Sequence, residues 1–192
     1  VLLIIPLLYS IIIHELAHGW VADKMGDSTA RWLGRLSLDP RKHLDPIGPL
    51  MLFIFGFGWA KPVPVNFANL HDQRKGLILV SSAGIMANIL LAFLSLFLLQ
   101  FLNPAPFGAF STFLIYMAQV NIMLAAFNLI PLPPLDGSKI LMGFAPPRFQ
   151  YTLAQIEPYG FFIILLLLML NMLDPLISLF ERIIIGIIGI IL

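Results

Sequence analysis

The segment IIIHELAHGW, residues 11–20, places two histidines and a glutamate inside a strongly apolar run. Its centre, His14-Glu15-Leu16-Ala17-His18, has the spacing H-E-x-x-H. Residues four apart lie on one face of a helix, so both imidazoles can reach one zinc ion at about 2.0–2.1 Å. Glu15 can then accept a proton from a water that the metal activates. The alternative is a structural histidine pair on a solvated face, and it is weak because the run shows no such face.

A catalytic zinc site needs a third protein ligand and one open position. The chain has no cysteine, and His43 and His71 lie in charged segments where we expect interfacial side chains. Asp136 directly follows an apolar run that is ended by prolines, in the sequence FNLIPLPPLDGSKI. Asp136 is therefore the better candidate for the third ligand. An ordinary Asp-Gly turn at a helix exit is the alternative explanation of this residue.

The composition indicates an integral membrane protein. Hydrophobic residues make up 59% of the 192 residues and charged residues only 11%, against about 25% charged in soluble domains. Three runs, at about 1–22, 77–102 and 109–130, are long enough for the roughly 20 residues of a membrane-spanning helix. Further helices are expected at about 159–173 and 176–192, the last either a short span or a helix lying in the interface. The net charge of +1, with no basic tract, gives no indication of nucleic-acid binding.

The segment between the first two spans is expected to lie at the membrane surface. Residues 47–60 are apolar but too short for a span and contain glycine and proline, which favours a re-entrant segment. Residues 35–38 and 61–67 look extended, so we expect a small β-hairpin within about 31–70. Basic residues flank the re-entrant segment on both sides, which predicts by the positive-inside rule that 23–76 is cytoplasmic. The first and third spans would then be parallel, with the histidine pair and Asp136 on the same side.

These elements predict an all-α, polytopic membrane bundle forming a single domain over 1–192. Each core span carries one face of small or polar residues: Ser10, His14 and His18 on the first, Ser81, Gly84, Asn88, Ala92 and Ser95 on the second, and Ala118, Asn121, Ala125 and Asn128 on the third. Such faces either pack helices together or line a polar cavity.

Three motifs in this order resemble the site-2 protease family of intramembrane zinc metalloproteases, peptidase family M50. They are HELAH at 14–18, GIMAN at 84–88 and NLIPLPPLDG at 128–137. The stretch FGWAKPVPVN at 57–66 is similar to the family's segment between the first two core helices. The resemblance covers about residues 10–160 and fits the minimal bacterial or archaeal type, without a PDZ or CBS domain. Ser138 stands where the family often has a second glycine.

The resemblance implies one Zn²⁺ per chain, held by His14, His18 and Asp136, with Glu15 as catalytic base and acid. It also implies that four motif residues line the active site: Gly84, Asn88, Asn128 and Pro131. Asn128 could orient the substrate backbone or the oxyanion, or serve only in helix packing.

The expected function is hydrolysis of peptide bonds within or near transmembrane segments of membrane-protein substrates. The expected location is the cell membrane, with the active site open towards the cytoplasm. A substrate helix must unwind before attack, and an edge near KPVPVN could hold it by strand addition, unless this stretch is a surface loop. One alternative is a non-proteolytic zinc-binding membrane protein or transporter. Another is a membrane zincin of a different type, with a third ligand such as Glu157. The oligomeric state is not predicted.

Overall fold

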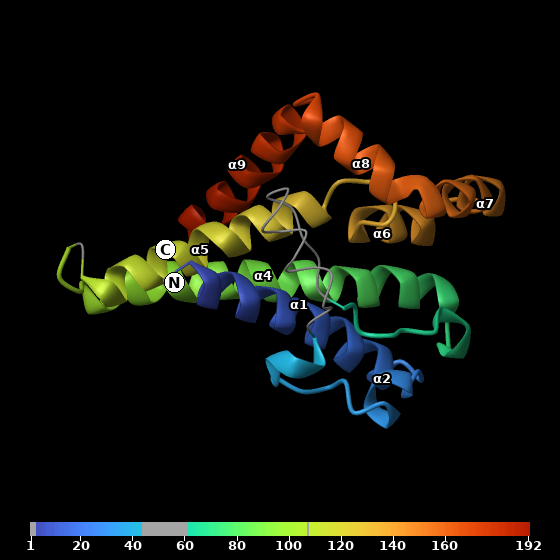
Figure 1. The fold of residues 1–192 in the computed structure, drawn as a ribbon, viewed down its shortest axis with the longest axis horizontal. Coiled ribbons are helices and arrows are strands. Elements are labelled where there is room, and N and C mark those ends of the chain that lie inside the picture. The colour runs from blue at the N-terminus through green and yellow to red at the C-terminus, as the bar shows by residue number, and fades with distance from the viewer. Residues whose placement is uncertain (1–2, 44–60, 107) are drawn as a thin grey trace.

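The computed structural model describes residues 3–43, 61–106 and 108–192, and the regular elements in these ranges are all helical (Figure 1). They are α1 (Ile4–Lys24), α2 (Thr29–Trp32), η1 (Pro40–Lys42), η2 (Phe67–Asn69), α4 (Gln73–Leu102), α5 (Ala109–Asn128), α6 (Asp136–Phe144), α7 (Pro147–Ile156), η3 (Glu157–Tyr159), α8 (Gly160–Met169) and α9 (Asp174–Ile191).

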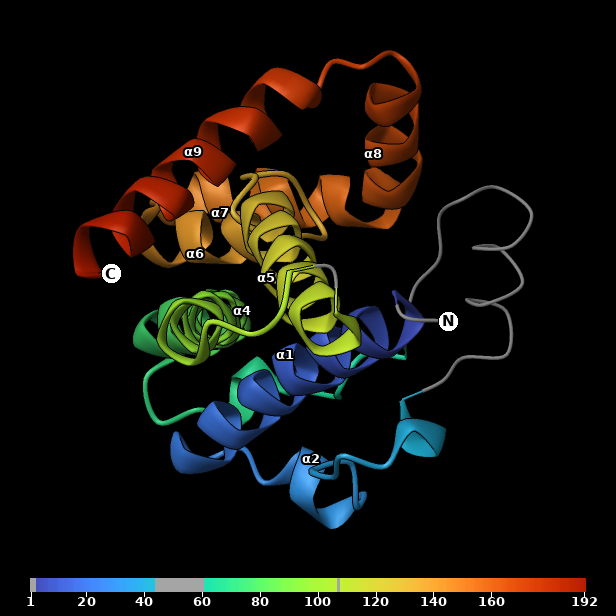
Figure 2. The same ribbon diagram turned by 90° about the vertical axis from the view of Figure 1, so that its left-hand side faces the viewer.

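The helices α1, α4 and α5 form the centre of the molecule. The long α4 packs against α1, α5 and α6, and α1 also contacts α5, so that α1, α4 and α5 form a bundle (Figures 1 and 2). α1 and α5 run in the same direction and α4 runs against both (Figure 1). Ala92 of α4 and Ala125 of α5 are fully buried, because small side chains let membrane helices approach closely. The ends of α1 and α5 therefore meet at the same end of the bundle.

Four helical segments are long and apolar enough to cross a membrane: Ile4–Lys24, Gln73–Leu102, Ala109–Asn128 and Pro147–Met169. The first three agree with the predicted core spans to within a few residues at each end. The longest of them, α4, begins and ends at recognisable signals. Asp72 caps α4 by accepting a hydrogen bond from the Lys75 N–H at 3.0 Å, and Asn103 ends it in the left-handed conformation, with φ of 40°. The chain is therefore a helical membrane protein.

The C-terminal part differs from its prediction. The expected helix at 159–173 is only the end of a longer helical segment, in which α7, η3 and α8 follow one another from Pro147 to Met169. α9 then turns back along α5, so that α8 and α9 form the V-shaped pair in Figure 1. Ile184 and Ile188 of α9 are buried against Ile85 of α4 and Ile122 of α5. That α9 is either a short span or a helix lying in the interface stays a prediction.

The predicted β-hairpin is not formed in the described part of the chain, which contains no strand. Residues 35–38 form a bend, and 61–66 are irregular. Pro62 and Pro64 have no N–H, so this segment cannot donate a continuous ladder of hydrogen bonds. Its polar groups bond to side chains instead, since Arg35 donates to the carbonyl oxygens of Lys61 and Pro62 at 2.9 and 3.1 Å. The re-entrant prediction for 47–60 lies outside the described residues.

A buried carboxylate holds the surface segments together beyond the end of α1. Asp27 is fully buried and accepts hydrogen bonds from the Thr29 hydroxyl at 2.5 Å, the Asn66 N–H at 2.7 Å and the Asn69 amide at 2.9 Å. Burial by itself raises the pKa of Asp27, but these hydrogen bonds outweigh it and hold the pKa below its ordinary value. The ionised carboxylate thus joins the α1–α2 corner to the segment that precedes α4.

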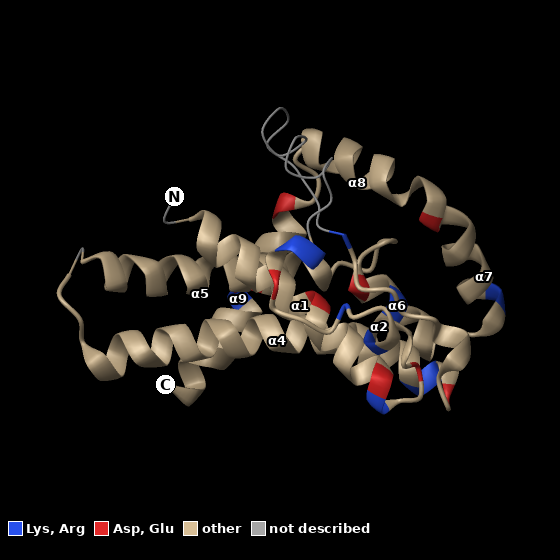
Figure 3. Ribbon diagram, turned by 60° about the horizontal axis from the view of Figure 1, so that its bottom comes forward, with Lys and Arg blue, Asp and Glu red and all other residues tan. Residues whose placement is uncertain are grey.

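Charged side chains are unevenly distributed along the bundle. They gather where α1 ends and α4 begins, around α2, α6 and α7, whereas the end at the α4–α5 connection carries none among the residues drawn (Figure 3). This polarity agrees with the charge pattern used above to predict the orientation. The orientation itself stays a prediction.

Candidate metal centre

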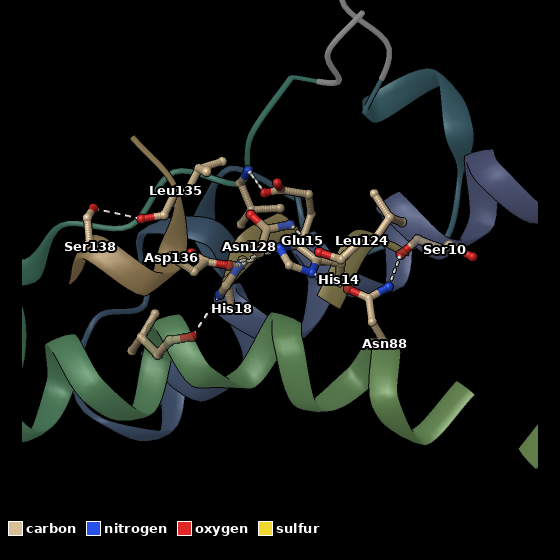
Figure 4. Close-up of polar contacts among 12 residues, drawn as sticks. Ser10, His14, Glu15, His18, Asn88, Leu124, Asn128, Leu135, Asp136 and Ser138 are labelled. Carbon is tan, nitrogen blue, oxygen red and sulfur yellow. Dashed lines mark hydrogen bonds and ion pairs between the residues drawn. The ribbon is translucent and has the colours of Figure 1, made fainter. Parts of the chain in front are cut away.

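The two histidines of the H-E-x-x-H motif lie one turn apart on α1 and point at the same place (Figure 4). Their Nε2 atoms are 3.0 Å apart, and the rings stand at 87° to one another. Both side chains are buried. The helical spacing of four residues is what puts the two rings on one face, as the sequence predicts.

Asp136, the first residue of α6, lies beside this histidine pair although it is far from both residues in the sequence. Its Oδ2 atom lies 3.1 Å from Nε2 of His14 and 3.1 Å from Nε2 of His18. No other group of three or more His, Asp or Glu side chains with this arrangement occurs in the described ranges. The parallel course of α1 and α5 makes the meeting possible, because each helix delivers its C-terminal end to the same side of the bundle.

The chain between α5 and Asp136 is irregular but internally bonded. The Leu135 N–H donates to the Leu132 carbonyl at 2.9 Å, and the Ser138 hydroxyl donates to the Leu135 carbonyl at 2.7 Å. Gly137 is required by close approach, since a Cβ there would lie 2.3 Å from the Leu129 carbonyl oxygen. This tight return places the first turn of α6 directly beside the end of α5.

The second ring nitrogen of each histidine is held by a carbonyl oxygen. Nδ1 of His14 lies 2.5 Å from Oδ1 of Asn88, and Nδ1 of His18 lies 2.7 Å from the backbone oxygen of Val80 (Figure 4). A carbonyl oxygen can only accept, so Nδ1 is the protonated nitrogen in both rings. In a neutral imidazole this leaves Nε2 with a free lone pair, which is the form that binds a metal.

The donor set fits a zinc ion. Two Nε2 lone pairs and a carboxylate oxygen converge at 3.0–3.1 Å, and the buried Oδ2 of Asp136 has no hydrogen-bond donor among the described residues. Three acceptors at this distance repel one another unless a metal ion or a proton lies among them. In a tetrahedral zinc site with bonds of about 2.0–2.1 Å, ligand atoms are about 3.3 Å apart. Two imidazoles and a carboxylate also leave a fourth position open, as catalytic zinc requires.

Gly84 allows α4 to approach the metal ligands. A Cβ at this position would lie 2.5 Å from Nε2 of His18 and 2.6 Å from Nε2 of His14. The motif spacing G-x-x-x-N places Gly84 and Asn88 one turn apart on the same face of α4. Gly84 thus leaves room for the rings, and Asn88 holds one of them.

Glu15 lies beside the histidines and is held by a backbone group. Its Oε2 accepts a hydrogen bond from the Val63 N–H at 2.8 Å. Val63 stands between Pro62 and Pro64 in the irregular segment, so its N–H is a donor flanked by two residues that have none. The segment 61–66 therefore orients the carboxylate of Glu15 instead of pairing as a strand.

A cavity of about 760 Å³ opens in front of these residues. His14, Glu15, His18 and Asp136 line it, together with an apolar wall that includes Pro62, Val65, Phe67, Leu135 and Phe161. Such a cleft, apolar with a few convergent polar groups, is typical of a ligand-binding site.

The structure places the four expected lining residues differently from one another. Asn128 lines the cavity, and its amide donates to the Leu124 carbonyl at 3.0 Å. Gly84 and Asn88 lie behind the histidines, and Pro131 is exposed and is not among the cavity residues. Glu157, considered above as another third ligand, lines the cavity but does not join the histidine pair.

The sequence did not reveal two backbone groups that hold site residues: the Val80 carbonyl, which holds His18, and the Val63 N–H, which holds Glu15. Every residue type except proline has both groups, so no residue type could have indicated them. His43 was expected at the interface but is fully buried, with Nε2 2.7 Å from the Ser37 oxygen. Lys139 of α6 also lines the cavity and lies 5.8 Å from the centre of the Phe67 ring. Its position three residues after Asp136 is the signal that could have identified it.

Comparisons with known proteins identify the family of this chain. The model of the family described as Peptidase family M50 matches residues 103–171. A Bacillus subtilis protein named "Putative zinc metalloprotease YwhC" is 45% identical over 172 residues, which cover 86% of this chain and 78% of the relative. A Mycolicibacterium smegmatis protein named "Putative zinc metalloprotease Rip2" is 31% identical over 175 residues, 88% of this chain and 66% of the relative.

A more distant relative is the protein named "Zinc metalloprotease MJ0392" of Methanocaldococcus jannaschii, 28% identical over 149 residues, or 78% of this chain and 36% of the relative. No solved structure matches the chain. The resemblance drawn from the three motifs is confirmed, as is the expectation of zinc as cofactor. The chain belongs to peptidase family M50, the site-2 protease family of zinc metalloproteases.

Proposed function

We propose that this protein is an intramembrane zinc endopeptidase that hydrolyses peptide bonds within or near transmembrane segments of other membrane proteins. One observation carries the proposal. Three metal-binding atoms converge at 3.0–3.1 Å beside a glutamate, inside a bundle of helices long enough to cross a membrane. Membership of a metalloprotease family supports the reaction class, and the apolar helices support the location of the substrate bond.

In this proposal His14, His18 and Asp136 hold one zinc ion per chain. When bound, zinc polarises the scissile carbonyl and makes a water molecule acidic enough to act as nucleophile near neutral pH. Glu15 accepts the proton of that water and returns it to the leaving amine. The Val63 N–H, 2.8 Å from Oε2, keeps the Glu15 carboxylate turned towards the cavity during both transfers.

The cavity suits a peptide that has left its helical conformation. Its apolar wall can take substrate side chains from the lipid phase, and the Asn128 amide can hydrogen-bond to an exposed substrate carbonyl or to the developing oxyanion. Residues 61–66 line the cavity as an irregular, proline-containing segment, where a substrate backbone could lie alongside. Transmembrane proteins are therefore the proposed partners. The charge-rich end of the bundle is the proposed cytoplasmic side of the cell membrane.

The test is a pair of substitutions in the purified chain, assayed with a transmembrane reporter peptide in detergent or liposomes. Glu15→Gln keeps all three metal ligands, so we expect bound zinc to remain and cleavage to fall by at least a hundredfold, as for loss of a general base. Asp136→Ala should lose zinc and cleavage together. Cleavage retained by Glu15→Gln would refute the mechanism. A wild-type chain that holds zinc, cleaves nothing and conducts zinc into proteoliposomes would favour the transporter alternative.

A further inference from the structure

A network of hydrogen-bonded, buried polar residues lies behind the metal centre and joins the three central helices. Ser10 of α1, Asn88 of α4 and Asn121 of α5 are each fully buried. The Asn88 amide nitrogen lies 2.7 Å from Oδ1 of Asn121, and the Asn121 amide nitrogen lies 2.7 Å from Oγ of Ser10 and 2.8 Å from the Met117 carbonyl. The network reaches the metal centre through the 2.5 Å contact between Oδ1 of Asn88 and Nδ1 of His14.

The Met117 backbone carbonyl fixes the direction of the hydrogen bonds in this network. The Met117 carbonyl can only accept, so the Asn121 NH₂ group must face it and Oδ1 must face Asn88. Asn88 therefore turns its own NH₂ group towards Asn121 and its Oδ1 towards His14. A longer contact of 3.5 Å from the Asn88 amide to the Ser10 carbonyl has the same polarity. Nδ1 of His14 is then the protonated nitrogen, and Nε2 keeps the lone pair that faces Asp136.

We propose that Asn121 and Asn88 are positioning residues that select the ring nitrogen with which His14 binds the metal. Neither residue touches the metal position or the substrate. Asn121 sets the orientation of the Asn88 amide, and Asn88 sets which nitrogen of His14 carries the proton. The inference rests on the zinc site of the proposed function and deepens it, because it explains how a lone pair is presented in a region with little water to reorient an amide.

The two histidines differ in this respect. In His18 the proton is held on Nδ1 by the Val80 backbone carbonyl, which can only accept a hydrogen bond. In His14 the proton is held on Nδ1 by the side-chain amide of Asn88. This amide would present its NH₂ group to the ring if it were turned over. If Asn88 were inverted, the His14 proton would move to Nε2 and point at the metal position. Asn121, at 2.7 Å, is thus the main group that prevents inversion of Asn88, and the Ser10 carbonyl at 3.5 Å adds only a weak contact in the same sense.

A packing role for Asn121 predicts something different, and a double-variant cycle separates the two. Asn121→Leu keeps a similar volume but removes the acceptor that orients Asn88. Asn88→Asp places a carboxylate at position 88, and an ionised carboxylate accepts from Nδ1 of His14 whichever way it is turned. In that background Asn121 no longer decides the polarity of His14. Ser95→Ala is the control for loss of a buried polar group on α4, since the Ser95 hydroxyl bonds only to its own helix at Leu91 in the contacts described.

The measurement is zinc affinity by chelator competition, on the full chain in detergent, for the wild type, both single variants, the double variant and Ser95→Ala. We expect Asn121→Leu to weaken zinc binding about 10- to 100-fold, the usual range for a group that orients a ligand, and by less than about threefold in the Asn88→Asp background. Equal losses in the two backgrounds, or no loss in the wild-type background, would overturn the inference while leaving the proposed function intact. A wild-type chain that binds no zinc would overturn both.

A second measurement observes the position of the proton in the wild type itself. Nitrogen-15 NMR of the histidine rings in the zinc-free wild type, at mildly alkaline pH, should show His14 protonated at Nδ1, with its signals identified by their absence from His14→Asn. Protonation at Nε2 would contradict the inference.

Discussion

Replacing Gly84 by alanine tests the packing of α4 against the metal ligands. The added methyl carbon would lie 2.5 Å from Nε2 of His18 and 2.6 Å from Nε2 and Cε1 of His14. The two Nε2 atoms are the ones proposed to bind zinc, so relief of the clash must move the ligands themselves. Neither ring can turn away freely, because Nδ1 of each is held by a carbonyl oxygen at 2.5–2.7 Å.

The size of the effect follows from these distances. Ordinary contacts begin at 3.4 Å, so the rings would have to withdraw by roughly 0.8–0.9 Å, several times the roughly 0.2 Å within which metal–ligand distances are held. Overpacking of this kind costs about 1–3 kcal/mol. If that cost falls on the zinc-bound form, zinc binds about 5- to 150-fold more weakly. Cleavage of the reporter peptide should fall at least in proportion to the zinc that is lost.

The assay is zinc affinity by chelator competition, with thermal unfolding measured in parallel. Gly189→Ala in α9 is the uncrowded control, since no atom lies within 4 Å of a Cβ at that position, and it should bind zinc like the wild type. Gly76→Ala is the crowded control on α4 itself, because a Cβ there would lie 2.3 Å from Cδ1 of Leu70 and the nearest atoms include none of the metal ligands. It should lower stability but leave zinc affinity unchanged. Wild-type zinc affinity in Gly84→Ala would refute the proposed arrangement of α4 and the ligands.

Two further predictions concern stability. Removal of zinc with a chelator should lower the midpoint of thermal unfolding, because three converging acceptors lose their cation. Zinc at a concentration of about 100 times its Kd should restore about 2.7 kcal/mol of unfolding free energy. An unchanged midpoint in chelator would count against the site. Asp27→Asn should cost roughly 1–3 kcal/mol near neutral pH, because an amide cannot accept the same set of hydrogen bonds. The folded pKa of Asp27 lies below the unfolded value, so its contribution is present above about pH 4 and lost as pH falls through the folded pKa. Urea unfolding across this range should show a shallower loss of stability in Asp27→Asn than in the wild type, and parallel curves would contradict this role.

Much of the metal centre could be predicted because it is local. The spacing of His14 and His18 is a property of one helix, and helical periodicity alone puts both rings on one face. The candidate ligand Asp136 followed from its place after a proline-ended span, and the lengths of the apolar runs located the core helices. The resemblance to peptidase family M50 used the same motifs, each of which lies within one element or one turn.

Other features could not be read from the chain because they depend on contacts between distant segments. The expected strand at 61–67 is absent because its backbone groups bond to Glu15 and Arg35, which lie far away in the sequence. The roles of the Val80 carbonyl and the Val63 N–H carry no residue signature at all. Asn121 was visible only as one polar residue on a helix face, and that pattern fits packing equally well.

The sequence by itself determined which side chains were available for zinc chemistry and which stretches could cross a membrane, since both depend on residue type and short-range spacing. Only the tertiary structure brought the Asp136 carboxylate within 3.1 Å of two imidazoles and linked Met117, Asn121 and Asn88 to one nitrogen of His14. The physical reason is that periodicity sets the faces of each helix, whereas packing of α1, α4 and α5 sets the distances between those faces.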